Sequence, residues 1–207
     1  MIRKINLVLM LVVFMVTGLV LAADGDKKTD KAKDEEKAES KLVLVKLETN
    51  MGDIVLELDA EKAPVTVENF LRYVNEKFYD RVIFHRVING FMIQGGGFEA
   101  NMKRKETHEA IKNEASNGLK NDRGTIAMAR TSDPNSATAQ FFINHNNNKS
   151  LDYVKDKNAG YAVFGKVVKG MGIVDKIAVV KTKTWNGMED VPVEPVIINT
   201  ATVVKEK

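Results

Sequence analysis

Eight short apolar runs most constrain what this chain can fold into. They cover residues 42–48, 53–59, 82–88, 91–94, 125–129, 140–144, 162–168 and 196–204. Two other segments, 64–78 and 171–179, carry apolar residues at steps of three and four, which predicts amphipathic helices. Because this order is not a repeating strand-helix-strand unit, a parallel doubly wound sheet is disfavoured. We expect a mainly β fold, a closed antiparallel eight-stranded β-barrel capped by two α-helices, since closure removes exposed strand edges.

Local signals define several connections between these elements. Asn50-Met51-Gly52 predicts a short turn that joins the first two runs into a β-hairpin. Pro64 lies near the start of the first helix, and Thr66 is a possible N-cap. Residues 99–123 are polar and rich in Asn, so we expect one long ordered loop there rather than a second domain.

The first 22 residues have the layout of a secretory signal peptide. Arg3 and Lys4 precede an apolar run over residues 7–21, and the small residues Ala22 and Ala23 follow it. We expect cleavage after Ala22 and a periplasmic or otherwise exported protein. The alternative is a retained membrane anchor, although the run is short for a span of about 20 residues.

A charged segment separates this leader from the first strand. Residues 24–41 contain six Lys against seven Asp plus Glu and almost nothing apolar, so they cannot bury enough surface to fold. We interpret residues 23–41 as a charged disordered linker, with a short charged helix as the alternative. The single folded domain is then expected over residues 42–207.

Composition and motif spacing exclude several classes of function. The formal charge of +3 falls to +1 when the two leader cations are removed, which gives little support for nucleic-acid binding. The chain has no Cys, so neither a disulfide nor a lipid-attached form is available. The three histidines, His85, His108 and His145, lack metal-ligand spacing, and no Gly-x-Ser-x-Gly nucleophile motif is present. No metal or cofactor is expected.

Two segments combine polar groups with large apolar side chains. Residues 84–97 set Arg86 and Gln94 among apolar neighbours, and residues 140–144 repeat the combination of amide and aromatic side chains. An apolar floor with a few converging donors is the usual composition of a binding groove. Taken alone, Arg86 is more simply explained as a partner in an ion pair.

The backbone around Arg86 carries two further expectations. If its strand alternates, Arg86 lies on the same face as Phe84 and Ile88. The glycines at 95–97 favour a bend at the end of a strand that lines the site, because Gly permits a close approach of backbone or ligand. A simple loop is the alternative. The glycine spacing from Gly90 resembles a phosphate loop, but the Lys and Ser or Thr of that motif are missing.

Together these segments closely resemble the cyclophilin-type peptidyl-prolyl cis-trans isomerases, over residues 42–204. The matching segments are Phe84 to Ile88, Gly90 to Gly96, Met128-Ala129, Ser136 to Ile143 and Val163 to Val167. The short loops and the leader are similar to the exported bacterial branch. The resemblance implies an enzyme that accelerates rotation about Xaa-Pro bonds and assists the folding of exported proteins. Its partners would be proline-containing polypeptides, and it would act as a monomer.

The resemblance implies Arg86 as the catalytic residue. A guanidinium close to the proline nitrogen favours the twisted amide, in which that nitrogen regains a lone pair. Such a step requires no nucleophile, metal or cofactor. The positions that the resemblance assigns to substrate binding are His85, Phe91, Met92, Gln94, Ala129, Arg130, Gln140, Phe142, Leu151 and Tyr161.

These positions have different expected roles. An apolar wall formed by Phe91, Met92, Phe142 and Leu151 would receive the proline ring. The Gln94 side chain would steady Arg86 or bind a substrate carbonyl, and Gln140 would line the same groove. Backbone groups at Ala129 and Arg130 would pair with the extended peptide. His85 would shape the groove, and Tyr161 stands where many family members have His.

One departure from the family pattern carries a prediction. Ser150 precedes Leu151 where cyclosporin-sensitive relatives have Trp, and the only Trp of this chain is Trp185. We expect weak cyclosporin binding with isomerisation retained, since the large aromatic contact is missing. Titration of purified protein with cyclosporin in an isomerase assay checks this, and nanomolar inhibition would contradict it.

Two other readings of the same residues compete with the enzyme. The groove could serve a peptide-binding chaperone module with little turnover. An uncleaved leader could display the domain as a surface adhesion or interaction protein. Turnover on an Xaa-Pro peptide separates the first of these from the enzyme, and the N-terminus of the exported form tests the second.

Overall fold

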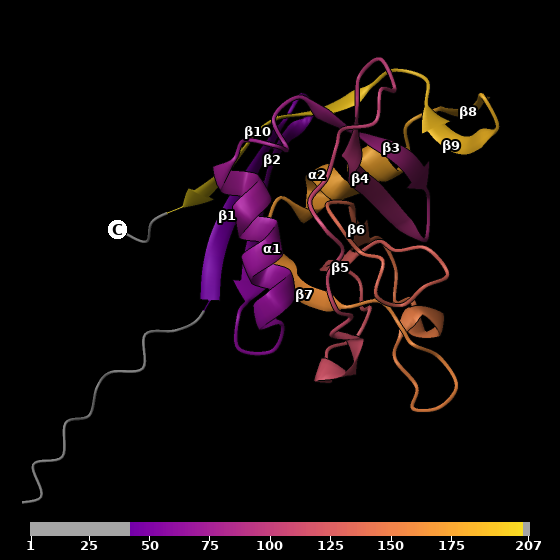
Figure 1. The fold of residues 1–207 in the computed structure, drawn as a ribbon. Helices are drawn as coiled ribbons and strands as arrows, with labels where there is room; N and C mark the ends of the chain where they lie inside the picture. Colours follow the sequence, from indigo (N-terminus) through magenta and orange to yellow (C-terminus); the bar gives the residue numbers. More distant parts are fainter. Residues whose placement is uncertain (1–41, 205–207) are drawn as a thin grey trace, which may run out of the picture. The chain divides into compact units, whose positions relative to one another are not determined.

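The computed structural model describes residues 42–204, and their strands close into a barrel (Figure 1). The barrel strands are β1 (Leu42–Thr49), β2 (Gly52–Asp59), β3 (Val82–Ile88), β4 (Met92–Glu99), β5 (Thr125–Met128), β6 (Phe141–Asn144), β7 (Val163–Lys169) and β10 (Val196–Val204). Their order around the barrel is β1-β10-β3-β4-β6-β5-β7-β2, and all neighbouring pairs are antiparallel. The expected closed eight-stranded barrel is confirmed. The predicted signal peptide and linker, residues 1–41, lie outside the described residues, as do residues 205–207.

A separate two-stranded sheet was not predicted. It consists of β8 (Thr182–Trp185) and β9 (Met188–Pro192), which pair with each other outside the barrel. Asn186 and Gly187 connect them with φ of 45° and 82°. Asn-Gly at a two-residue connection is the strongest short-range hairpin signal, so the sequence did contain the information.

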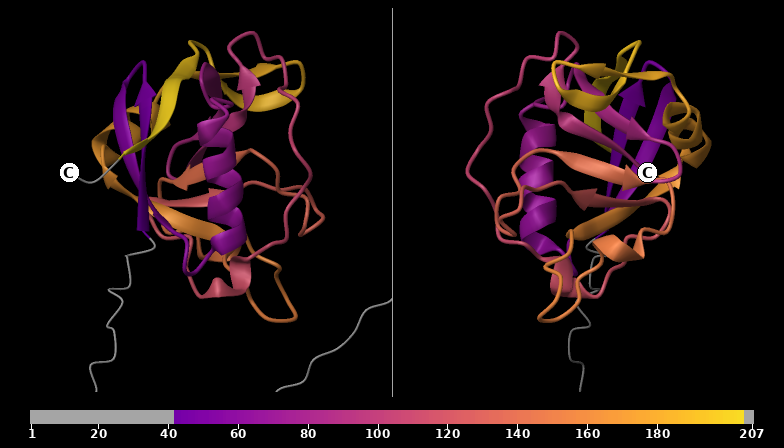
Figure 2. Two further views of the ribbon diagram at one scale, coloured as in Figure 1. Left: turned by 60° about the vertical axis from the view of Figure 1, so that its left-hand side comes forward. Right: turned by 90° about the vertical axis from the view of Figure 1, so that its right-hand side faces the viewer.

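The two expected helices are α1 (Pro64–Asn75) and α2 (Met171–Ala178), which lie on opposite sides of the barrel (Figure 2). On α1 the apolar face is buried, and Phe70 packs edge to face against Phe141 with ring centroids 5.6 Å apart. The predicted helical segment was too long at its end. It reached residue 78, but the chain leaves the helix after Asn75 and Lys77 adopts a left-handed φ of 56°.

The predicted N-cap of α1 is wrong. The cap position is Ala63, and Thr66 lies within the first turn of the helix. A carboxylate from the long loop replaces the cap: Glu114 accepts hydrogen bonds from the backbone N–H of Val65 (3.2 Å) and of Thr66 (2.8 Å). These N–H groups have no partner within the helix, so a distant carboxylate can satisfy them and also oppose the helix dipole.

The loop over residues 99–123 is ordered, as expected. It contains one short 3-10 helix, Ala115–Asn117, and an isolated β-bridge joins Ile111 to Ala137. No helix within residues 42–204 combines the length and the apolar character needed to cross a membrane.

Candidate active site

A row of directly paired residues crosses the outer face of the sheet. Arg86 on β3 pairs with Gln94 on β4, which pairs with Phe142 on β6. Phe142 pairs in turn with Ala127 on β5. Residues directly opposite each other on antiparallel strands project from the same face. The barrel therefore places the predicted catalytic Arg beside Gln94 and in one row with Phe142 two strands away, although Phe142 is distant in sequence.

The prediction that Phe84 lies on the same face of β3 as Arg86 is wrong. The pairing of β3 with β4 shifts between Phe84 and Arg86, which indicates a bulge. Phe84 and Val87 both belong to the core cluster of the barrel, whereas Ile88 packs on a second, outer cluster. The bulge turns Arg86 to the outer face with Ile88 while leaving Phe84 inside.

The outer cluster forms the apolar part of the site. Met92 and Phe142 are buried, with 2% and 4% exposure, together with Ala127 and Val163. Partly buried residues packed against these four are Ile88, Phe91, Leu119, Ala129, Leu151 and Tyr161. All four residues predicted to receive the proline ring thus lie in one cluster on the outer face of the sheet. Leu119, from the long loop, was not predicted.

Polar side chains border this cluster on one side. The Gln94 Nε2 donates a hydrogen bond to the Gln140 Oε1 at 3.0 Å. Arg130 stacks on Tyr161, with its guanidinium carbon 4.4 Å from the ring centroid. The Nε of Arg130 also donates to the Gly160 carbonyl at 2.9 Å, so this side chain is held against the groove residue Tyr161. Tyr161 in turn meets Phe142 edge to face at 5.7 Å.

The three adjacent glycines lie within β4 and not at its end, which corrects the expectation of a terminal bend. They let neighbouring groups approach closely. A Cβ at Gly96 would lie 2.8 Å from the Ala139 carbonyl oxygen, and a Cβ at Gly97 would lie 2.7 Å from the Gln140 Cγ. Gly97 therefore leaves the space in which Gln140 can reach Gln94.

The side chain of Arg86 is 43% exposed and forms one weak ion pair. Its Nε lies 3.8 Å from the Oδ2 of Asp190, a residue of the unpredicted β8–β9 hairpin. Asp190 has a left-handed φ of 61°. Ion pairs as exposed as this one stabilise a fold little, so Asp190 holds the Arg86 side chain only weakly. Asp190 could not be found from the sequence, since about a hundred residues separate it from Arg86.

His85 lies behind the groove and not in it. It is 3% exposed, and its ring packs 4.7 Å from the ring of Phe98. Within residues 42–204 its Nδ1 has no hydrogen-bond partner. Burial, and to a smaller extent the charge of Arg86, lower the pKa of His85 from 6.5 to about 4, against an opposing hydrogen bond to the Ile83 backbone. The role of His85 in shaping the groove stays a prediction, and its burial leaves it little surface for the substrate contact that the resemblance assigned to it.

The free energy of unfolding is expected to decrease as the pH is lowered, because of His85. Its pKa is lower in the folded domain than in the unfolded chain, so the unfolded chain binds the extra proton between pH 6.5 and about 4. The free energy of unfolding is at its full value above pH 6.5. About 3 kcal/mol of it is lost as the pH falls to 4. Urea unfolding of wild type and His85→Gln across this range measures the effect. Parallel pH curves for the two proteins would contradict it.

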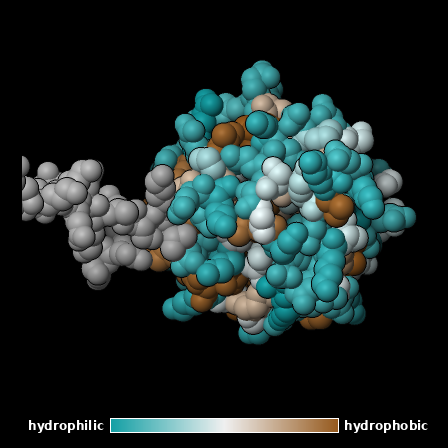
Figure 3. Space-filling view, turned by 90° about the horizontal axis from the view of Figure 1, so that it is seen from below, coloured by the Kyte–Doolittle hydropathy of each residue, from teal (hydrophilic) through white to brown (hydrophobic). Residues whose placement is uncertain are grey.

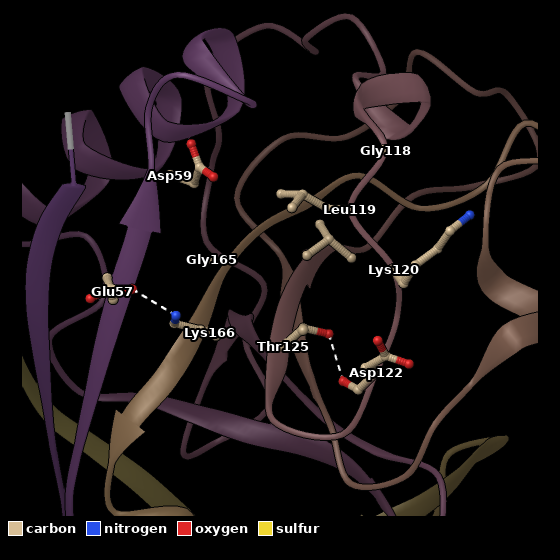
Figure 4. A pocket seen from close by; sticks show the side chains of 10 residues that line it. Glu57, Asp59, Gly118, Leu119, Lys120, Asp122, Thr125, Gly165 and Lys166 are labelled. Carbon is tan, nitrogen blue, oxygen red and sulfur yellow. Dashed lines mark hydrogen bonds and ion pairs between the residues drawn. The ribbon is translucent and has the colours of Figure 1, made fainter. Parts of the chain in front are cut away.

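Two hollows lie near the outer cluster. The smaller, of about 230 Å³, is lined by Gln94, Arg104, Ala129, Arg130, Thr131, Ser136, Thr138 and Gln140, four of which are predicted substrate-binding residues. The larger, of about 470 Å³, lies between β2, β5 and β7, and Leu119 points into it (Figure 4). Lys166 on its wall is paired with Glu57 at 3.0 Å. Of these two hollows, only the smaller has predicted site residues in its lining.

No group of three His, Asp or Glu side chains within residues 42–204 is placed to hold a metal ion. The site described above consists of a guanidinium, two amides and an apolar cluster on the outer face of a closed barrel. An apolar cluster with a few polar groups at its edge has the usual composition of a ligand-binding site.

Comparison with known proteins identifies the family. The model for cyclophilin type peptidyl-prolyl cis-trans isomerases matches residues 44–203. Peptidyl-prolyl cis-trans isomerase B of Escherichia coli is 58% identical over 162 residues, covering 77% of this chain and 99% of that protein. Peptidyl-prolyl cis-trans isomerase A of Dickeya dadantii is 55% identical over 162 residues, covering 78% and 85%.

Solved structures agree with these relatives. A Cryptosporidium parvum cyclophilin-type isomerase has a TM-score of 0.67 at 26% identity, covering 80% of this chain and 99% of that one. The same protein crystallised in the presence of the dipeptide Ala-Pro has a TM-score of 0.66 at 28% identity, with coverage of 79% and 99%. The chain belongs to the cyclophilin-type peptidyl-prolyl cis-trans isomerases, and it is an enzyme of that type acting on proline-containing polypeptides.

Proposed function

We propose that this isomerase acts on exported polypeptides, with Arg86 as its catalytic residue and the outer cluster as its proline site. The observation that most directly supports this assignment is the row from Arg86 through Gln94 to Phe142. It sets a half-exposed guanidinium at the edge of an apolar surface, as a twisted Xaa-Pro bond requires.

The chemical argument starts from the barrier to rotation. Rotation about a peptide bond costs about 18–20 kcal/mol because resonance is lost as the bond twists. The two end states of Xaa-Pro differ by only about 0.5–1 kcal/mol, so catalysis changes the speed and not the balance. In the twisted state the proline nitrogen carries a lone pair that accepts a hydrogen bond. A guanidinium directed at it stabilises that state more than either planar state.

The remaining groups orient the substrate in this proposal. Phe91, Met92, Phe142 and Leu151 receive the proline ring, which has no N–H to satisfy. The backbone at Ala129 and Arg130 pairs with the extended peptide. The Gln94–Gln140 hydrogen bond leaves the Gln94 Oε1 available to accept from Arg86. It leaves the Gln140 Nε2 available to donate to a substrate carbonyl.

The leader sequence supports the proposed cellular role. Residues 1–22 as a cleaved signal peptide would place the enzyme outside the cytoplasm, where uncatalysed prolyl isomerisation takes tens of seconds or more. We propose a monomer that works without metal or cofactor. In support of the monomer, the apolar patches on the face shown in Figure 3 are small and separated by hydrophilic surface.

Two measurements test this proposal. Mass spectrometry of the protein from an expressing bacterium should give an N-terminus at Ala23 in the exported fraction. An N-terminus at Met1 in the membrane fraction would favour the anchored alternative. Refolding of an exported protein with a proline-limited phase should be accelerated by the purified domain. A slow phase of unchanged rate would remove the folding role.

A further inference from the structure

Three buried asparagine side chains lie next to the outer cluster, and we call them the amide network. They are Asn121, Asn144 and Asn148, with exposures of 1%, 0% and 8%. Asn144 belongs to β6 and pairs with Met92, so its side chain projects on the outer, groove face of the sheet. The other two come from the connections before β5 and after β6.

Hydrogen bonds join the three amides in a chain. The Asn148 Nδ2 donates to the Asn144 Oδ1 at 2.7 Å. The Asn144 Nδ2 donates to the Asn121 Oδ1 at 3.2 Å and to the Thr125 Oγ1 at 2.9 Å. Each side-chain carbonyl of Asn144 and Asn121 thus accepts a bond from the next amide. Buried amides that are satisfied in this way are stiff, because breaking one bond leaves a desolvated partner unpaired.

The two ends of this chain reach the backbone of groove residues. At one end the Asn148 Nδ2 also donates to the Phe91 carbonyl at 2.8 Å. At the other end the Asn121 Nδ2 donates to the Leu151 carbonyl at 3.1 Å, with the Tyr161 carbonyl at 3.5 Å. Phe91 follows the turn between β3 and β4, whereas Leu151 and Tyr161 flank the loop before β7.

We propose that the amide network is a positioning device for the isomerase, which fixes the separation between Phe91 and Leu151 and so matches the groove to a five-membered ring. The inference rests on the proposed proline site. The network does not touch the substrate; it acts through the backbone of the residues that do. Loss of one link is expected to loosen the groove, so that proline is held less well and a larger ring is rejected less.

The test compares two substrates in each variant. One is an Ala-Pro tetrapeptide, and the other carries pipecolic acid, whose ring has one more methylene, in place of proline. Exchange NMR measures cis-trans interconversion of both. In Asn148→Ala the kcat/KM for the proline peptide is expected to fall about 10-fold. The preference for proline over pipecolate is expected to fall about 3-fold.

Asn69→Ala is the matched control. Asn69 has the same 8% exposure as Asn148, and its Nδ2 also donates to a backbone carbonyl, that of Thr138, at 2.7 Å. It lies on α1 outside the outer cluster. Asn69→Ala removes one buried side-chain hydrogen bond and Asn148→Ala removes two, so both lower the melting temperature. Only Asn148→Ala should change the preference between the two rings, and an unchanged preference in a folded Asn148→Ala domain overturns the proposal.

Two sets of NMR signals, from side chains and from the backbone, test the proposal if the variant does not fold. If Asn148→Ala does not fold, the wild-type side-chain NH2 signals of Asn148 and Asn121 are followed by NMR as the Ala-Pro peptide is added. Saturation must shift both signals, and constant shifts overturn the proposal. Failure of the proline site itself is distinguishable, because the peptide would then leave the backbone signals of Phe91 and Leu151 unchanged as well.

Discussion

Replacing Arg86 with alanine is expected to lower kcat/KM on an Xaa-Pro peptide by about 10²–10³-fold, the usual cost of removing one donor aimed at transition-state charge. The domain should stay folded. Arg86 is 43% exposed, and its partner Asp190 lies 3.8 Å away and is itself 35% exposed. A surface pair of this kind contributes little to stability.

Exchange NMR or a protease-coupled assay measures this loss, with circular dichroism as the check of folding. Arg72→Ala is the matched control, since Arg72 is an exposed Arg paired with Glu76 on α1, away from the groove. Its activity should equal that of wild type. A folded Arg86→Ala domain with more than a tenth of wild-type kcat/KM would remove Arg86 from the catalytic role. Loss of turnover with client protection intact would show a separable chaperone activity.

Replacing Gly170 with alanine is expected to lower the free energy of unfolding by about 3 kcal/mol or more. Gly170 connects β7 to α2 and has a left-handed φ of 91°, which side chains rarely adopt. A Cβ there would lie 2.2 Å from the Asp53 carbonyl oxygen and 3.0 Å from the Ile54 Cα. These are backbone atoms of β2, so relief of the contact requires the sheet to move.

Gly172→Ala, two residues away, is expected to raise the free energy of unfolding rather than lower it. Gly172 is the second residue of α2, and a Cβ there would meet nothing within 4 Å. Alanine in a helix is favoured over glycine by about 0.5–1 kcal/mol, so this variant should be slightly more stable than wild type. Urea unfolding of both variants measures the difference. Equal stabilities for the two would show that the approach of β2 to Gly170 is not a constraint.

Local patterns predicted most of the elements because strands and helices impose their own periods on a sequence. The eight barrel strands and both helices lie where apolar spacing placed them, since this spacing reports which side of an element is buried. Errors arose where a distant group intervened. Thr66 resembled an N-cap, but Glu114 satisfies the start of α1 from the long loop. Strict alternation failed at Phe84, because the partner strand β4 imposes a bulge.

The sequence by itself determined the positions of the eight barrel strands and, to within a few residues, of both helices, together with the family resemblance and the choice of Arg86, because each rests on residues close together along the chain. Only the tertiary structure decided what surrounds Arg86 and what supports the groove. The β8–β9 hairpin brings Asp190 to Arg86, and the pairing of β4 with β6 brings Asn148 to the carbonyl of Phe91. Such contacts join residues far apart in sequence, and their geometry depends on bulges and register that no single segment specifies.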